Sequence, residues 1–235
     1  MKLEEYLRGG FVQMGLTLDE DMLRRYRIYC DYLTEINAVM NLTAIEGEEN
    51  TARLHFLDCA ALLTMENMGG KSLIDVGSGA GFPGLALKIA CPDIRLTLLD
   101  SLDKRINFLK NTCGRLGFAD VNCIHCRAEE APAEFRAAFD AVTSRAVARL
   151  NLLCELCLPL VKKGGVFLAM KSTDHQAELE EAEKAIRLLG GEVERRADYT
   201  IPGTEITHSA IIIRKVSDTP AKYPRRWAQI KKSPL

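Results

Sequence analysis

Hydrophobic and polar positions along the chain follow two different periods. In the first seventy residues apolar side chains recur every three or four positions, as in Leu3, Leu7 and Phe11, which is the spacing of a helix with one buried face. The spacing continues in Met22, Tyr26, Tyr29, Leu33, Ile36 and Met40. Thr17–Glu20 has the form of a capping box at the start of this second helix. The pattern therefore predicts two helices here and a third from about Asn50 to Met65.

After Gly69 and Gly70, short apolar runs alternate with amphipathic segments. This βαβ order is typical of a parallel sheet with helices on both faces. The predicted strands are Ser72–Val76, Arg95–Leu99, Val121–His125, Ala141–Ser144, Val166–Met170, Glu192–Ala197 and His208–Lys215. The predicted helices are Pro83–Ala90, Asp103–Leu116, Leu150–Val161 and Asp174–Leu189. Because no helix separates the last two strands, we expect an antiparallel pair at the end of the sheet. The predicted α/β chain divides into a helical cap (1–69), a sheet domain (70–216) and a tail (217–235).

Composition agrees with a folded, water-soluble chain. Of the 235 residues 47% are hydrophobic and 27% charged, and the formal net charge is −1, which is ordinary for a globular protein. No apolar run reaches secretory or membrane-spanning length, so we expect a cytoplasmic protein without membrane association. The tail, in contrast, is locally basic. It contains one acid, Asp218, and the cations Lys222, Arg225, Arg226, Lys231 and Lys232.

The eight cysteines are expected to be free thiols in a reducing compartment. Two C-x-x-C pairs, Cys123/Cys126 and Cys154/Cys157, have the spacing of half a zinc site. The gap between the pairs exceeds the usual ribbon spacing of about 15–20 residues. The first pair also lies in a predicted strand, where residues three apart face opposite sides. We therefore expect structural thiols and no metal.

The most informative segment runs from Leu73 to Gly84, where a short strand leads into a loop with glycine at every second position. Such a strand–loop–helix unit brings backbone close to a ligand at the carboxyl edge of a parallel sheet. The third glycine comes one residue earlier than in the dinucleotide pattern G-x-G-x-x-G. The carboxylate before the loop would also repel a pyrophosphate but tolerates the cation S-adenosylmethionine. A nucleotide-dependent oxidoreductase is thus the disfavoured alternative. The expected methyl-donor residues are Asp75, Gly77, Ser78, Gly79 and Phe82.

Two further segments follow predicted strands at the same edge. Asp100 can accept hydrogen bonds from both ribose hydroxyls of an adenosine group, or it can cap the helix that begins near Leu102. Ala128 leaves room for adenine, and a backbone amide or Glu129 can bond to the base. The alternative for this second segment is a solvated acidic loop.

The methyl acceptor is expected beyond the fourth strand, at Thr143–Arg149. The segment lacks the Asn/Asp-Pro-Pro-aromatic loop used for exocyclic amines and the Pro-Cys element used for pyrimidine carbons. Arg145 offers a planar cation that can stack on a base or bond to its edge. A ring nitrogen with a free lone pair, such as guanine N7, needs alignment and no general base. We therefore expect Arg145 to be catalytic; a structural ion pair with Asp140 or Glu129 is the alternative.

Several residues are candidates for RNA contact. Lys171 ends the fifth strand at the same edge, where it either binds the substrate or only lays its stem along the strand end. His55 lies one helical turn from Asp58, so it either contacts the substrate or forms a local hydrogen bond. The tail interleaves aromatic residues with Arg225, Arg226 and Lys231. That mixture can bind RNA phosphates and stack an unpaired base; a solvated basic tail is the alternative.

Taken together, these motifs resemble one family, the bacterial 16S rRNA guanine-N7 methyltransferases, also called the glucose-inhibited division protein B family. The matching segments occur in the family's order and span nearly the whole chain. They are Asn41–Ala44, His55–Asp58, Asp75–Gly84, Leu98–Ser101 with Lys104 and Arg105, Ala128–Glu129, Thr143–Ala148 and Lys222–Arg226. The chain departs from the family pattern at Ile36, where tryptophan is usual, and at Ser172, where glycine is usual.

The resemblance implies a Rossmann-like class I methyltransferase sheet with an N-terminal helical cap. It implies methyl transfer from S-adenosylmethionine to N7 of a guanine in the 530 loop of 16S rRNA. The implied donor contacts are Gly77, Phe82, Ala128, Glu129 and Arg145, with Asp100 near the ribose. The partner would be 16S rRNA or the small ribosomal subunit, and we expect the enzyme to be a monomer. A non-catalytic RNA-binding protein with a vestigial donor site is the remaining alternative.

Overall fold

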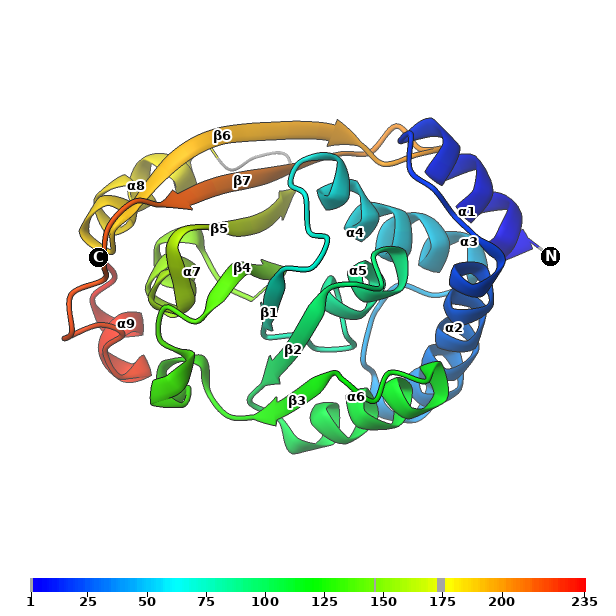
Figure 1. Ribbon diagram of the computed structural model, residues 1–235, viewed down its shortest axis with the longest axis horizontal. Helices are drawn as coiled ribbons and strands as arrows, with labels where there is room; N and C mark the ends of the chain where they lie inside the picture. Colours follow the sequence, from blue (N-terminus) through cyan, green and yellow to red (C-terminus); the bar gives the residue numbers. More distant parts are fainter. Residues whose placement is uncertain (1, 146, 173–175) are drawn as a thin grey trace.

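The computed structural model describes residues 2–145, 147–172 and 176–235. In these residues seven strands form one sheet, in the order β3-β2-β1-β4-β5-β7-β6 (Figure 1). The first five strands along the chain pair in parallel, whereas β7 is antiparallel to both β5 and β6. The strands are β1 Ser72–Val76, β2 Arg95–Asp100, β3 Asn122–His125, β4 Phe139–Arg145, β5 Val161–Ser172, β6 Gly191–Thr200 and β7 Thr207–Lys215. The predicted α/β sheet and its antiparallel end are confirmed.

Helices cover both faces of this sheet. The helices are α1 Lys2–Gln13, α2 Glu20–Met40, α3 Glu48–Asn50, α4 Asp58–Ala60, α5 Gly84–Ala90, α6 Asp103–Leu116, α7 Leu150–Cys157, α8 Gln176–Leu188 and α9 Trp227–Lys232. In Figure 1, α1 to α6 lie on one side of the sheet, and α7 to α9 lie on the other. The third predicted helix exists but is irregular. Between α3 and α4, residues Thr51–Leu57 are wound as a π-helix, and Ala61–Thr64 form a 3₁₀ turn after α4.

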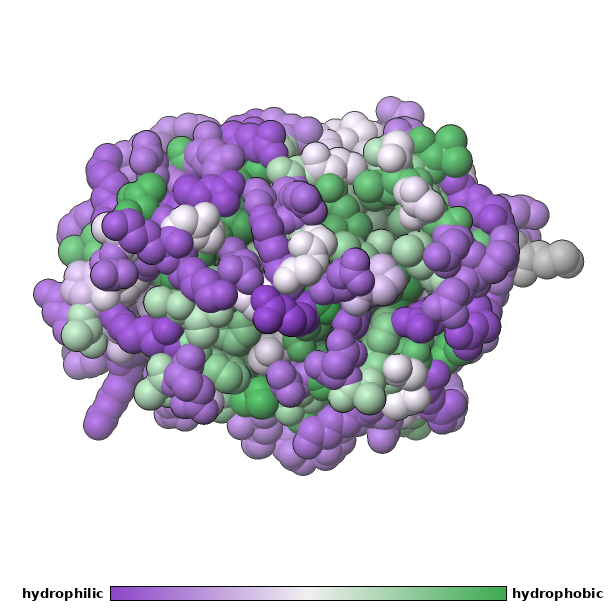
Figure 2. All heavy atoms as spheres, in the orientation of Figure 1, coloured by the Kyte–Doolittle hydropathy of each residue, from purple (hydrophilic) through white to green (hydrophobic). Residues whose placement is uncertain are grey.

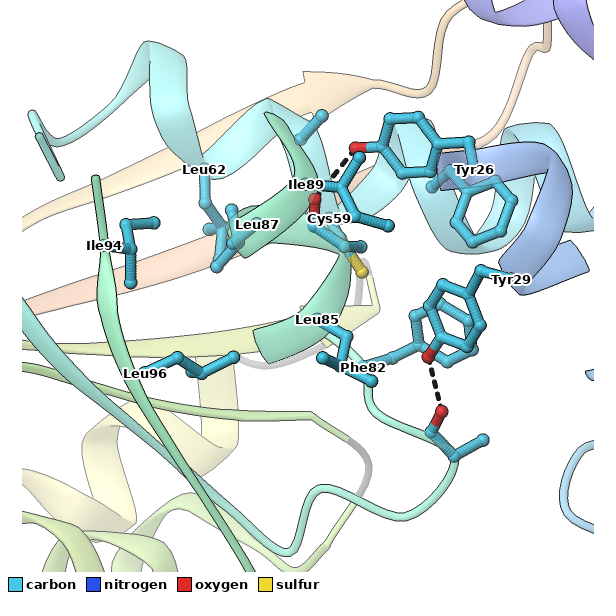
Figure 3. Close-up of a cluster of buried hydrophobic side chains, with 14 of the residues drawn as sticks. Tyr26, Tyr29, Cys59, Leu62, Phe82, Leu85, Leu87, Ile89, Ile94 and Leu96 are labelled. Atoms are coloured by element: carbon cyan, nitrogen blue, oxygen red, sulfur yellow. Dashed lines mark hydrogen bonds between the residues drawn. The ribbon is translucent and has the colours of Figure 1, made fainter. Parts of the chain in front are cut away.

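Alternate residues of each strand face two separate hydrophobic cores, as the two-residue repeat of a strand requires. Leu73 of β1 packs against the N-terminal helices with α5 and α6, whereas its neighbour Ile74 packs against α7 and α8. Figure 3 shows how α2 is joined to the first core. The buried hydroxyl of Tyr26 donates to the carbonyl of Ala86, 2.8 Å away, and that of Tyr29 donates to the carbonyl of Ala80. The second of these bonds fixes the N-terminal helices directly to the loop after β1.

The start of α2 differs from the prediction. Its N-cap is Asp19, whose carboxylate accepts a hydrogen bond of 2.8 Å from the backbone N–H of Met22. The capping box predicted at Thr17 is therefore wrong by two positions. Both residue types can cap a helix, and the hydrophobic repeat does not distinguish between them.

The boundary between α7 and β5 also differs. The predicted helix Leu150–Val161 ends at Cys157 and is followed by a 3₁₀ turn that contains Pro159, which has no N–H to continue the helical hydrogen bonds. Strand β5 then begins at Val161, five residues before the predicted start. Asp174, the predicted first residue of the next helix, lies outside the described residues.

The outer surface is mostly hydrophilic on the face shown in Figure 2, with smaller hydrophobic areas between the polar side chains. Among the described residues, no helix combines the length and the apolar character needed to cross a membrane. All eight cysteines are free thiols.

Candidate functional site

A cavity of about 970 Å³ lies at the edge of the sheet where the parallel strands end. Its walls come from the segments that follow β1, β2, β3 and β4, together with the end of β5 and the start of β7. The loop after α2 and the π-helical segment close it on the N-terminal side. Ligands of open α/β sheets bind at this edge, so the cavity is the candidate site.

The glycine loop forms the floor of the cavity. Gly77 and Ser78 both donate backbone hydrogen bonds to the carbonyl of Leu99, at 2.8 and 3.1 Å, which hold the loop against β2. Gly77 has a φ of +74°, and a Cβ at this position would collide with Val147. Glycine is therefore required here both for conformation and for space. Gly77, Ser78 and Gly79 line the cavity, as the sequence predicts.

Asp75 lies beneath the loop, and it is not among the residues that line the cavity. Its side chain is completely buried, and one oxygen accepts a hydrogen bond of 2.9 Å from the N–H of Gly84 at the start of α5. The other oxygen has no partner in the protein. Burial raises the pKa of Asp75 to about 7, against the opposing effect of the Gly84 bond. Asp75 was expected to face the ligand. It instead supports the glycine loop from the side away from the cavity.

Asp100 reaches the cavity wall from the end of β2. One carboxylate oxygen accepts the N–H of Leu102 at 3.0 Å, but Leu102 is itself the N-cap of α6 and no side chain caps the helix, so the capping role weighed as an alternative is not observed. The other oxygen accepts the N–H of Gly79 at 2.9 Å and lies 3.4 Å from Arg105. Asp100 therefore braces the glycine loop, and its carboxylate is still part of the wall.

Ala128 and Glu129 form a 3₁₀ turn after β3 and line the same end of the cavity. The Glu129 side chain is only 6% exposed and lies 3.5 Å from Arg127. This placement differs from the solvated acidic loop considered as the alternative. A small apolar residue next to a hydrogen-bond acceptor can accommodate the edge of a base.

The opposite end of the cavity is built on Phe82, which ends the glycine loop. The rings of His55 and Phe82 are stacked at 4.1 Å with an interplanar angle of 6°. Tyr29 stacks on Phe82 at 5.2 Å, and the guanidinium of Arg145 lies 5.0 Å from the same ring. The loop, the π-helical segment and the end of β4 therefore meet on one aromatic side chain.

Arg145 is held by the N-terminal helices. Its guanidinium lies 3.0 Å from the carboxylate of Asp58 and also donates to the carbonyl of Leu54 and to Nδ1 of His55. The structural partner is thus Asp58 and neither of the two acids weighed from the sequence. Asp140 instead binds Ser72 and Lys162, and Glu129 pairs with Arg127. Arg145 still lines the cavity.

Asp58 collects hydrogen bonds from three elements. Besides Arg145, it accepts bonds of 2.8 Å from the hydroxyl of Tyr199 on β6 and from Nδ1 of His208 on β7. The hydrogen bond that His208 donates to Asp58 raises the pKa of His208 above its usual value and outweighs the effect of partial burial. His208 lines the cavity, so its charged form is favoured at the cavity wall.

His55 is held in the neutral form. Burial, reinforced by the charge of Arg145, lowers its pKa to about 2. Because Nδ1 accepts from Arg145, the ring proton is on Nε2, 2.9 Å from the hydroxyl oxygen of Thr43. His55 and Thr43 both line the cavity. His55 does not form the local hydrogen bond to Asp58 that was considered from the sequence. Both residues instead accept hydrogen bonds from Arg145.

Lys171 is partly enclosed at the cavity wall. Its ammonium donates to the carbonyl of Ala148 at 3.0 Å and lies 2.6 Å from Glu178, which also lines the cavity. Only 11% of the side chain is exposed. The snorkelling position weighed as an alternative is therefore not observed.

The basic tail is tied to the protein at Arg225. Its backbone N–H, Nε and Nη2 all donate to the buried carboxylate of Glu155 on α7, at 2.9, 2.8 and 2.6 Å. Arg225 is thus a structural anchor for the tail, and its contact with RNA stays a prediction. Arg226 and Lys231 are exposed. Between them, Trp227 turns back and lines the cavity.

Sequence reasoning did not assign three residues that the structure brings to the site. They are Thr43, Tyr199 and His208. Thr43 lies in a matching family segment, so a signal existed for it. Tyr199 and His208 come together only through the antiparallel pairing of β6 with β7, which no local pattern reveals.

Comparison with known proteins identifies the family. A family model described as "rRNA small subunit methyltransferase G" matches residues 22–203. The relative from Lachnoclostridium phytofermentans with that name is 46% identical over 229 residues, 96% of this chain and 95% of its own. Another, from Alkaliphilus metalliredigens, is 42% identical over the full length of both chains. The chain belongs to this family. The resemblance inferred from the sequence is confirmed, and membership does not favour the oxidoreductase or the vestigial-site alternative.

Solved structures support the fold. TrmN from Thermus thermophilus matches with a TM-score of 0.53 at 18% identity, over 67% of this chain and 48% of its own. TYW2 from M. jannaschii, solved in complex with AdoMet, matches with a TM-score of 0.52 at 12% identity, over 65% and 72%. At these identities the likeness concerns the fold of the methyltransferase sheet.

Neither cysteine pair belongs to a larger group of metal-binding side chains in the part of the chain that the structure describes. In the described ranges there is no group of three or more His, Cys, Asp or Glu side chains placed to hold a metal ion. Cys154 and Cys157 are completely buried in the second hydrophobic core.

Proposed function

We propose that the protein transfers a methyl group from S-adenosylmethionine to N7 of a guanine in the 530 loop of 16S rRNA. The observation that carries the proposal is the single continuous cavity. At one end it is lined by the glycine loop, Asp100 and Glu129; at the other it is lined by Arg145 and His208. One end suits a nucleoside and the other a base.

The first end fits the methyl donor. The positive φ of Gly77 leaves backbone, with no side chain, facing the cavity. The carboxylate of Asp100 is available to ribose hydroxyls, and Ala128 with Glu129 is available to adenine. When bound, S-adenosylmethionine supplies a methyl group on a positively charged sulfur. Carboxylates at this end favour that cation over a phosphate-bearing coenzyme.

The second end suits an acceptor that does not need to lose a proton. His55 is neutral but its Nδ1 is occupied by Arg145, and the carboxylate of Asp58 is occupied by Arg145, Tyr199 and His208. The bond from His208 to Asp58 raises the pKa of that ring, which favours the protonated form, and this form cannot accept a proton. Guanine N7 has a lone pair and no proton. Its lone pair forms the new N–C bond while the electrons of the C–S bond remain on sulfur, so the protein only aligns the partners.

Arg145 is the proposed catalytic residue, because it contacts both the donor loop through Phe82 and the acceptor end of the cavity. Among the residues expected to bind RNA, His55 and Lys171 line the cavity, while Arg226 and Lys231 lie on the exposed surface of the tail. The proposed domains are a helical cap (1–69), a methyltransferase domain (70–216) and a tail (217–235). The proposed enzyme is a cytoplasmic monomer that acts without metal on 16S rRNA or the small subunit.

The test is site-specific mapping of the product. Small ribosomal subunits and naked 16S rRNA lacking N7-methylguanine are incubated with the protein and labelled donor, and the modified guanine is located by chemical cleavage and reverse transcription. We expect one N7-methylated guanine in the 530 loop. Transfer to another atom or another region would overturn the assignment of the acceptor. Binding of NAD without binding of S-adenosylmethionine in calorimetry would overturn the assignment of the donor.

A further inference from the structure

The tail carries the only tryptophan of the chain to the cavity wall. Trp227 is the first residue of α9 and is partly buried. It packs into the second hydrophobic core, to which Cys126 and Ala128 also belong. Trp227, Ala128 and Glu129 all line the cavity. An aromatic ring from the end of the chain thus lines the same cavity as the turn after β3.

The position of Trp227 is fixed on both sides. Two residues earlier, Arg225 is clamped to the fully buried Glu155 by three hydrogen bonds of 2.6–2.9 Å. Three residues later, Ile230 is completely buried. Upstream, Arg136 donates to the carbonyl of Tyr223 at 2.7 Å and to that of Thr219 at 2.6 Å. A tail held this firmly presents its indole in one place, and does not behave as a loose basic arm.

The residues that line the cavity together with Trp227 suit a purine ligand. A flat aromatic ring, the small apolar Ala128 and the acceptor Glu129 are the groups that hold a purine by stacking and by bonds to its edge. Thr43 and His55, which line the acceptor end, come from the opposite face of the sheet, against which the N-terminal helices pack. Helix α7 packs against both α9 and the turn Ala128–Glu130, and Trp227 shares a hydrophobic core with Ala128, so we assign the ring to the donor end of the cavity.

We propose that Trp227 packs against the adenine ring of the methyl donor and closes that end of its pocket. The inference rests on the proposed function, because it concerns the same cavity and the same donor. It adds a residue from the tail to the donor contacts and makes the Arg225–Glu155 pair the positioning element for that residue. A stacked base is stabilised by roughly 1–3 kcal/mol.

The indole itself is the probe. Because Trp227 is the only tryptophan, fluorescence excited at the red edge of the indole band, where the six tyrosines absorb little, reports on this one site. We titrate the full chain with S-adenosylhomocysteine, adenosine and methionine, and measure the heat of binding of the same ligands in parallel. We expect S-adenosylhomocysteine and adenosine to change the emission with the midpoint found by calorimetry, and methionine to leave it unchanged.

The outcomes separate the two proposals. Heat of S-adenosylhomocysteine binding without any change in emission would overturn the role of Trp227 and leave the proposed function standing. No heat at all would overturn both. A change in emission with an rRNA fragment but not with S-adenosylhomocysteine would assign the ring to RNA and overturn the inference.

Variants supply a second readout. Trp227→Ala should weaken S-adenosylhomocysteine binding about tenfold, whereas Trp227→Phe should retain most of the affinity. The matched control is Gln229→Ala, an exposed position on the same helix, which should bind normally. Thermal unfolding of each variant checks that the tail remains packed. Normal affinity in a folded Trp227→Ala protein would contradict the proposal.

Discussion

The guanidinium of Arg145 lies 3.0 Å from the carboxylate of Asp58, although 87 positions separate the two residues in the chain. Asp58 is 1% exposed and the Arg145 side chain 17% exposed, so the pair is shielded from water. It joins the end of β4 to the short helix α4 that follows the π-helical segment. The pair therefore connects the expected catalytic residue to the N-terminal helices.

Replacing Arg145 should lower methyl transfer strongly. In Arg145→Ala, the acceptor end of the cavity loses its planar cation, and a misaligned acceptor lowers the rate about 100-fold. Single-turnover transfer to small subunits measures the effect. The control is Arg95→Ala, because the Arg95 side chain is 69% exposed and lies away from the cavity lining. Equal rates in the two variants would remove Arg145 from the mechanism.

The same pair should contribute to stability in a non-additive way. Removing Arg145 alone leaves the buried carboxylate of Asp58 with only Tyr199 and His208 as partners, so the loss should approach the cost of about 3–5 kcal/mol of breaking a buried pair. In Arg145→Ala combined with Asp58→Asn, that charge is gone, so the double variant should be more stable than the sum of the single effects predicts. Urea unfolding of the four proteins in this cycle gives the coupling. Strict additivity would show that the pair is not coupled.

His208 should make stability depend on pH. Its pKa in the folded protein is raised by the bond to Asp58, so the folded state favours the protonated ring. The stabilisation is complete below the ordinary pKa of about 6.5 and is lost as the pH rises through the higher folded pKa. The difference in unfolding free energy between the parent and His208→Gln should therefore shrink as the pH rises above about 6.5. A constant difference would mean that His208 does not titrate in this way.

Asp75 should give a pH dependence of a different origin. Its folded pKa is raised by burial from 3.8 to about 7, so between these values the folded state holds a proton that the unfolded state has lost. Stability should fall as the pH rises through this window. Asp75→Asn removes the cost of burying the charge. Relative to the parent, the variant should gain on the order of 3 kcal/mol between about pH 5 and pH 8, as measured by denaturant unfolding.

Two cations of the tail, Lys231 and Arg225, should behave differently when they are replaced. Lys231 is exposed, so Lys231→Ala should reduce the salt slope of rRNA binding by about 0.7–0.9 if the side chain contacts one phosphate, with normal stability. Arg225→Ala leaves the buried Glu155 without its partner and should chiefly lower the melting temperature. Filter binding over a salt series and thermal unfolding separate the two effects. A normal melting temperature for Arg225→Ala would contradict the role of Arg225 as an anchor.

Much of the fold and part of the site follow from local sequence. The strands before Gly77 and before Ser101 are marked by apolar runs and turn residues, and parallel strands end at one edge, so the convergence of the glycine loop, Asp100 and Glu129 could be predicted. The helix start at Asp19 could not, because Thr17 is also a capping residue. Local signals identify an element but not the exact residue at which it begins or ends.

The partners of charged residues were predicted poorly for a physical reason. Asp58 meets Tyr199 and His208 across 141 and 150 positions, and Arg225 meets Glu155 across 70. A sequence shows which residues carry charge, but pairing depends on how distant elements pack. The acids adjacent to Arg145 in the predicted sheet were therefore reasonable partners, yet a helix outside the sheet supplies the actual one.

The shared carboxylate of Asp58 also constrains how this protein can diverge. Arg145, Tyr199 and His208 all donate hydrogen bonds to the Asp58 side chain. A substitution of Asp58 alone therefore removes an acceptor from three donors at the same time. A relative that lost Asp58 would need further substitutions at Arg145, Tyr199 and His208, the residues that donate to it. We therefore expect the four positions to vary as a set among descendants of a common ancestor.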